Sequence, residues 1–271
     1  MATNFLIGRG ELLTRPVPPP KRNPQSRSVY SLEEARQALL PQIRNVVATF
    51  ESAPPGTLPD DIAVARLLIN PAYIARSYFP KELLKEAGLE AVGSRTVKVK
   101  PRRWARKGEP EEVSTTELFI AGRRKSFRAL PELALNLEAD EQVAEDFTHI
   151  ESIAPTVPED KIKAFAKGKR PVYEIGIHMV AGDAEAVQAA FAKYAQVVGV
   201  DLMLDLGFTV GNLWFLPIRG DQTQIKRISE FSLVRVIRPM PRLRGLRPVP
   251  SPSGVKIGCT LPTAQPLSSQ P

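Results

Sequence analysis

Histidine and cysteine, the side chains most readily used for acid–base and nucleophilic chemistry near neutral pH, are scarce in this sequence. The chain of 271 residues has two histidines, His149 and His178, and one cysteine, Cys259. A catalytic or metal-binding histidine needs a second group to orient or accompany it, and neither histidine has one at suitable spacing. Cys259 lies in a proline-flanked tail, which is a poor place for the charged surroundings that activate a thiol. GxSxG and Walker motifs are absent. We therefore predict a noncatalytic chain without a cofactor or a metal.

A basic stretch, SRTVKVKPRRWARK at 94–107, is the second candidate for chemistry. It contains lysines and arginines, no acidic residue and one tryptophan, a combination that can bind phosphates and stack a base. A solvated loop, or one that meets an acidic protein, explains the same pattern more simply, because one tryptophan is a thin stacking platform. The candidate contacts are Arg95, Lys98, Lys100, Arg102, Arg103, Trp104 and Arg106.

Composition limits the partners and the compartment. The formal net charge of +8 permits nucleic acid, an anionic surface or an acidic protein. A single cysteine excludes an internal disulfide framework. We find no apolar run of the roughly 18 residues that a membrane span needs, and MATNFLIGRGELL lacks the features of a signal peptide. We expect a cytoplasmic protein that does not bind membranes.

Hydrophobic periodicity predicts the same order of elements, β-α-β-β-α-β, twice. The first set comprises strand 61–70, helix 70–88, strands 89–100 and 115–122, helix 123–137 and strand 147–153. The second comprises strand 171–180, helix 183–199, strands 200–208 and 211–218, a helix capped by Asp221, and strand 233–237. Before both, Ser31 and Glu34 form a capping box for a helix within 31–50. The fold class predicted is α+β, with two tandem ferredoxin-like units behind an N-terminal arm and helix.

The domains expected from this order are four. They are an extended arm, proline-rich spacer and amphipathic helix at 1–58, a first ferredoxin-like unit at 59–158, a second at 159–240, and an extended tail at 241–271.

One face of the second predicted sheet is a candidate docking surface. In the strand 171–180, Tyr173, Ile175 and Ile177 alternate with Glu174 and His178, so the latter should face away from the helices. We expect Met203, Trp214 and Arg235 on the same outward face, because an exposed tryptophan beside charge is a typical interface anchor. A tryptophan that is simply part of the core is the alternative.

The tail combines basic residues with prolines. No Asp or Glu occurs after Glu230, and eight prolines lie between 239 and 271. Such a segment cannot fold a core of its own, but an extended, proline-rich peptide loses little entropy when it is bound. The candidate cleft-binding residues are Arg242, Leu243, Arg244, Gly245, Leu246 and Arg247. A linker without cleft contacts is the alternative.

The second unit with its tail, GNLWFLPIRGDQTQIKRISEFSLVRVI followed by RPMPRLRGLRPVPSPSG, resembles the propeptide of subtilisin-like serine proteases (subtilases). The resemblance implies a small domain that docks on the catalytic domain and a C-terminal extension that threads the active-site cleft. It implies roles as intramolecular inhibitor, folding chaperone or activation gate.

A longer set of motifs is similar to the N-terminal region of bacterial subtilases encoded beside an AAA-type ATPase. The motifs are NFLIGRGELLTR, DDIAVARLLINPAYIARSYFP, VGSRT, TTELFIAG, GNLWFLPI and IRPMPRLR. Some of these pairs are linked to the exclusion of plasmids and phages. The resemblance implies two partners, a subtilisin-like catalytic domain, in cis or as a separate chain, and an AAA-type ATPase. A nucleic-acid-binding module and a docking scaffold for the ATPase remain the competing functions.

Overall fold

The computed structural model describes residues 29–75, 78–103, 109–180 and 184–241. Its first helix, α1 (Leu32–Glu51), begins at the predicted capping box. The Ser31 hydroxyl accepts a hydrogen bond from the Glu34 amide at 3.2 Å, and the Glu34 carboxylate accepts one from the Ser31 amide at 2.8 Å. Both bonds satisfy amides that a helix start leaves free. The buried stripe of α1 follows helical spacing: Ala35, Leu39, Ile43, Val46 and Phe50.

The first sheet is four-stranded, with the order β2-β3-β1-β4 and antiparallel neighbours throughout. Its strands are β1 (Ile62–Ile69), β2 (Glu90–Val99), β3 (Val113–Arg123) and β4 (Ile150–Pro155). The connecting helices are α2 (Lys81–Glu86), α3 (Arg124–Asn136) and α4 (Gln142–Thr148), with 3₁₀ turns η2 (Pro59–Asp61) and η3 (Pro71–Tyr73). This is the ferredoxin-like order, in which each split β-α-β unit receives a strand between its two strands.

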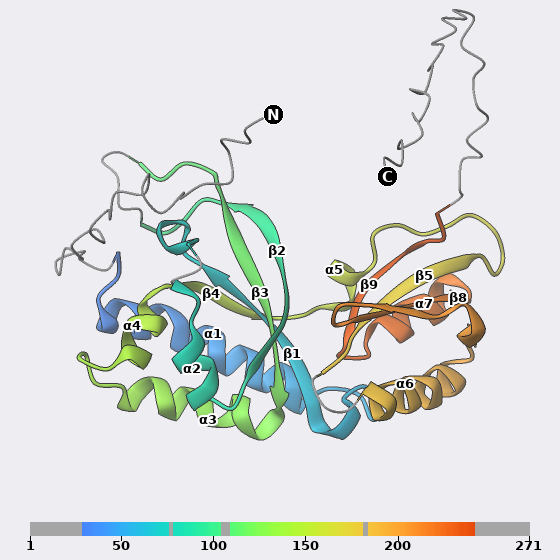
Figure 1. The fold of residues 1–271 in the computed structure, drawn as a ribbon, viewed down its shortest axis with the longest axis horizontal. Coiled ribbons are helices and arrows are strands. Elements are labelled where there is room, and N and C mark those ends of the chain that lie inside the picture. The colour runs from blue at the N-terminus through green and yellow to red at the C-terminus, as the bar shows by residue number, and fades with distance from the viewer. Residues whose placement is uncertain (1–28, 76–77, 104–108, 181–183, 242–271) are drawn as a thin grey trace, which may run out of the picture. The chain divides into compact units, whose positions relative to one another are not determined.

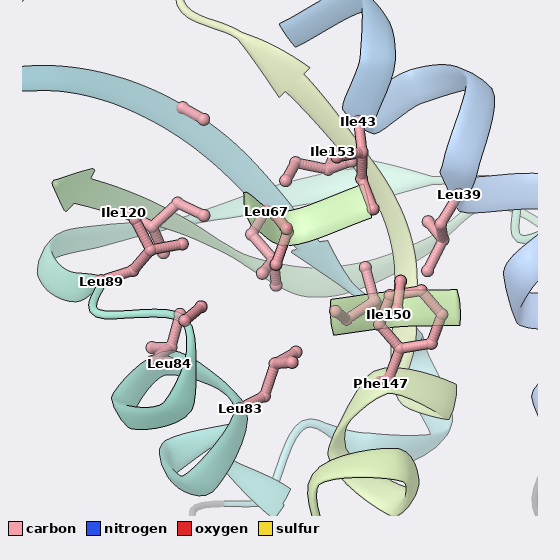
Figure 2. Packing of buried hydrophobic residues seen from close by; sticks show 14 of the residues in the cluster. Leu39, Ile43, Leu67, Leu83, Leu84, Leu89, Ile120, Phe147, Ile150 and Ile153 are labelled. Carbon is pink, nitrogen blue, oxygen red and sulfur yellow. The ribbon is translucent and has the colours of Figure 1, made fainter. Parts of the chain in front are cut away.

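Helices cover one face of this sheet, with α1 and α3 running along it (Figure 1). Figure 2 shows side chains from α1, α2 and α4 meeting those of the sheet, including Leu39, Leu83 and Phe147 against Leu67 and Ile120. The cavity left between them is about 10 Å³ and wholly apolar, so it is a packing gap and not a ligand site.

The second unit repeats the order. Its sheet runs β6-β8-β5-β9, and β7 also pairs with β8. The elements are α5 (Pro158–Lys161), β5 (Val172–His178), α6 (Ala184–Val198), β6 (Asp201–Leu202), the 3₁₀ turn η5 (Leu204–Leu206), β7 (Phe208–Val210), β8 (Leu213–Arg219), α7 (Gln222–Ser229) and β9 (Val234–Pro239). As predicted, Asp221 caps α7. The α+β class with two antiparallel sheets is confirmed.

The two sheets share a second core. Side chains from the far face of the first sheet, Val64, Val92, Phe119 and Ala121, belong to the same buried cluster as Tyr173 and the rest of the second unit. The Ser232 hydroxyl donates to the Ile62 carbonyl at 2.8 Å, and the Ser232 amide donates to the Thr57 carbonyl at 2.8 Å. Both sheets therefore belong to one compact unit, which ends at Met240.

Three predicted elements were wrong in extent. Within the described part of 70–88, the expected helix is reduced to η3 and the short α2, because Pro80 cannot continue a helix from before it. Residues 147–148, expected in a strand, end the unpredicted helix α4. The strand expected at 200–208 is broken into β6, η5 and β7. Pro217 of β8 explains this break, since a proline has no amide to donate to a neighbouring strand.

Candidate functional site

The register of β8 places Trp214 on the helix-covered face of the second sheet. Trp214 lies opposite Ile177 in the pairing of β5 with β8, and paired residues point to the same face. Its ring is 5% exposed and meets the Phe191 ring edge-on at 6.0 Å. The prediction that Trp214 lies on the outward face was wrong, and the core alternative holds.

The outward face beside β9 is covered by the first sheet. His178 is 1% exposed, and its ring centroid lies 5.5 Å from that of Phe119. The guanidinium carbon of Arg235 lies 3.6 Å from the Phe119 centroid, within the range of a cation–π contact. His178 and Arg235 do lie on the outward face, but they contact the chain's own β3, so they are not free for another protein.

Glu174 and Met203 are also engaged within the chain. Glu174 is buried, and Arg238, its cross-strand partner on β9, donates to its carboxylate. Met203 is half-buried, and its amide donates to the Pro217 carbonyl at 3.0 Å. The face predicted from period-2 alternation therefore does not form one open docking surface.

The outward face of the second sheet is open near its other edge, at β7. Phe208 pairs with Phe215, which pairs with Gly176, so both aromatic rings are on the outward face. They stack with centroids 5.6 Å apart. Phe208 and Val210 are 52% and 60% exposed. A β carbon on Gly176 would lie 2.8 Å from the Phe215 ring, so glycine is what lets this ring lie against the sheet.

The exposed apolar segment continues into η5, where Leu204 and Leu206 are 54% and 56% exposed. Within the described residues, β7 pairs only with β8, which leaves its other edge without a strand partner. Contiguous apolar surface and an open strand edge are both typical of protein contact sites. The sequence contained this signal in LDLGFTV, most of which we assigned to the strand predicted at 200–208.

A cluster of charged side chains lies between the two sheets. Arg66 forms an ion pair with Asp160 at 2.6 Å, and Arg95 forms one with Glu117. Lys161 is 4% exposed, and its amine donates to the carbonyls of Ser229 and Phe231 at 2.9 and 3.0 Å.

Burial and like charge shift the pKa values in this cluster. Burial lowers the pKa of Lys161 to about 7, with the Glu230 carboxylate acting in the opposite direction. Burial, with Arg235 and Lys161 nearby, lowers the pKa of His178 to about 3. The pKa of Arg235 falls to about 10, through burial first and the Arg95 charge second. Each change reflects the cost of a cation in a place with little water.

The arginines of the basic stretch are held by carboxylates. Besides the pair of Arg95 with Glu117, Arg102 pairs with Glu151 at 3.2 Å and Arg103 with Glu34 at 2.8 Å. Lys98, on β2, and Lys100, which follows it, are exposed. Trp104 and Arg106 lie outside the described residues. An arginine already paired with a carboxylate is a poor phosphate ligand.

Glu151 anchors this network. Its carboxylate accepts hydrogen bonds from the Tyr30 hydroxyl at 2.6 Å, the Asn70 amide group at 2.7 Å and the Arg102 backbone amide at 2.7 Å. Burial and the Glu151 carboxylate raise the pKa of Tyr30 to about 12. These bonds tie Tyr30, which precedes α1, to β4 of the first sheet.

The remaining predicted residues add no reactive arrangement. His149 is buried and stacks on Tyr73 with centroids 3.9 Å apart. In the residues that the structure describes, no three His, Cys, Asp or Glu side chains gather as metal ligands would. The predicted cleft-binding residues, from Arg242 to Arg247, lie outside the described residues. Among the described helices, none has an apolar stretch long enough to cross a lipid bilayer.

Comparisons with known proteins give no family. No protein-family model matches the chain, and a search of curated proteins finds no match. Among solved structures, a match is the crystal structure of an unknown protein from Galdieria sulphuraria, at 12% identity and a TM-score of 0.18. It covers 63% of this chain and 90% of that one.

Proposed function

We propose that this chain is the noncatalytic N-terminal region of a subtilisin-like serine protease, where it acts as an intramolecular inhibitor, folding chaperone or activation gate. The observation that carries this proposal is the arrangement of residues 172–241. A complete ferredoxin-like unit ends in β9, and β9 runs directly into an acid-free, proline- and arginine-rich segment. The motif resemblance to subtilase propeptides supports the same function.

The contact with the catalytic domain is assigned to the apolar surface of β7 and β8. The other half of the outward face is occupied by Phe119 and its neighbours. Phe208, Val210 and Phe215 remain available, and the free edge of β7 can add a strand of the protease. The folded unit then anchors the chain, and the tail reaches the cleft.

A Phe208→Asp substitution is expected to weaken inhibition of the cognate catalytic domain at least tenfold. It places a carboxylate in the centre of an apolar contact, where it would be desolvated without a partner. The measurement is the inhibition constant of the full chain against the active catalytic domain. Val197→Asp is the matched control, because Val197 is 69% exposed on α6. An equal inhibition constant for both variants would remove β7 from the contact.

A chain that ends at Pro241 is expected to inhibit at least tenfold less well than the full chain. A subtilase cleft receives a peptide as an added strand, so the tail should supply backbone hydrogen bonds that the folded unit cannot. Mass spectrometry of the mixture would locate any cut after Pro241. Equal inhibition by both chains, with no cut between 242 and 271, would leave the tail as a tether only.

The alternative functions have less support. Three of the arginines proposed for nucleic acid are paired with carboxylates, which leaves Lys98 and Lys100 exposed among the proposed residues that the structure describes. An AAA-type ATPase partner and a role in plasmid or phage defence follow from the resemblance, and a cytoplasmic location follows from the single cysteine and the lack of signal-peptide features; all three belong to the same proposal.

A further inference from the structure

A small pocket lies at the junction of the two sheets. Its volume is about 10 Å³, which is room for one occupant of about the size of a water molecule or a single-atom ion. Its polar lining comes from both units: Arg66, Arg95, Asp160, Lys161, His178 and Arg235.

The pocket has more positive than negative charge. Arg66, Arg95 and Arg235 line it together with Lys161, against the carboxylates of Asp160 and of Glu117, the partner of Arg95. With Lys161 protonated the sum is +2, and with Lys161 neutral it is +1. Among the described residues, Arg235 takes part in no ion pair, and it is influenced by both the like charge of Arg95 and the opposite charge of Glu117.

Polar atoms in this pocket also lack partners. The Nε of Arg66 is buried without a hydrogen-bond partner among the described residues, and the His178 ring keeps one nitrogen without a partner besides the one that faces the Val92 backbone. Buried polar atoms are bonded in the great majority of native structures, so two unpartnered atoms at one pocket, one from Arg66 and one from His178, point to an occupant. The side of the His178 ring at Cε1 and Nδ1 faces Gly93, where a β carbon would lie 3.2 Å from Cε1.

We propose that this pocket binds one small monovalent anion of the size of chloride, held by Arg66, Arg235 and the His178 ring. A cation is repelled by the surplus of positive charge. A water molecule would satisfy the orphaned N–H groups but leave the repulsion between Arg95 and Arg235 in place. An anion accepts from the Arg66 Nε–H and from the single N–H of the neutral His178 ring, and it also offsets that repulsion. It joins the two units because its ligands come from β1, β5 and β9.

The test is thermal unfolding of the full chain at pH 6 in sodium chloride and in sodium gluconate at equal ionic strength. Gluconate is too large for the pocket. Chloride in tenfold excess over its Kd is expected to raise Tm by about 3–6 °C relative to gluconate. Equal Tm values in the two salts would overturn the proposal.

Two substitutions and a bromide soak test whether the anion binds in this pocket. Arg235→Gln should abolish the difference between the salts, while Arg238→Gln, on the same strand but paired with Glu174 outside the pocket, should keep it. If Arg235→Gln does not fold, crystals of the unaltered chain soaked in bromide decide the question. An anomalous peak beside Arg66, Arg235 and His178 supports the anion site. A chloride effect that persists in Arg235→Gln, or a pocket without an anomalous peak, overturns it.

Discussion

Replacing Phe119 with alanine is expected to lower the free energy of unfolding by about 3–5 kcal/mol, the usual cost of deleting a buried phenylalanine ring. Phe119 lies on β3 and is 4% exposed. Although β3 belongs to the first sheet, this ring packs in the core of the second unit. Its loss opens a cavity where the two sheets meet. Since folded domains are stable by only about 5–15 kcal/mol, this is a large share of the total.

The Phe119 ring also supports charged neighbours. The guanidinium carbons of Arg235 and Arg95 lie 3.6 and 5.5 Å from its centroid, and the His178 ring lies 5.5 Å away. Without the ring, these groups lose the π face that partly compensates for their burial. The stability lost in Phe119→Ala should therefore exceed what the lost apolar contacts alone would account for.

Urea unfolding of the unaltered chain and of the Phe119→Ala variant measures the loss in free energy of unfolding. Phe208→Ala is the control, because it removes the same ring from an exposed position and should cost about 0.5 kcal/mol or less. A double-mutant cycle of Phe119→Ala with Arg235→Gln should give a coupling of about 0.5–2 kcal/mol. A cost below about 1 kcal/mol for Phe119→Ala would mean that the sheets do not depend on this contact.

Local rules were sufficient to predict most of the fold. The capping residues Ser31 and Asp221 fix the starts of α1 and α7, and the alternation of Tyr173, Ile175 and Ile177 correctly gives the buried face of β5. Each of these signals acts within a few residues of the chain, where spacing alone decides which side chains share a face.

The candidate site depended on information that is not local. Trp214 was misplaced because its face depends on the register of β8 against β5, which no pattern within β8 determines. The outward positions of His178 and Arg235 were right, but their cover comes from Phe119, at a distance of more than fifty residues in sequence. Lys161 lies in the charged run PEDK, which is typical of a surface segment. Only the packed structure shows that its side chain is buried.

Lys161 makes stability depend on pH in a direction that can be worked out. Burial lowers its pKa from 10.5 in the unfolded chain to about 7 in the folded one. Between these two values the unfolded chain binds a proton that the folded chain does not, so the free energy of unfolding increases with pH. The neutral amine still has two N–H groups for the carbonyls of Ser229 and Phe231, so deprotonation need not break either hydrogen bond.

The free energy of unfolding is therefore expected to gain about 2 kcal/mol from Lys161 between pH 6.5 and pH 8.5. Lys161→Met keeps the length of the side chain and removes the titrating group, so this gain should be missing from the variant. The free energy of unfolding is measured in urea at both pH values for the unaltered chain and for Lys161→Met. The readout is the difference between the two proteins in their change with pH, because the other titrating groups contribute almost equally to both. The pKa of His178, at about 3, keeps that ring neutral in the folded state at both pH values. If both proteins gain the same stability, Lys161 is charged in the folded chain at pH 8.5, and the cluster between the sheets then keeps its full charge of +2 at that pH.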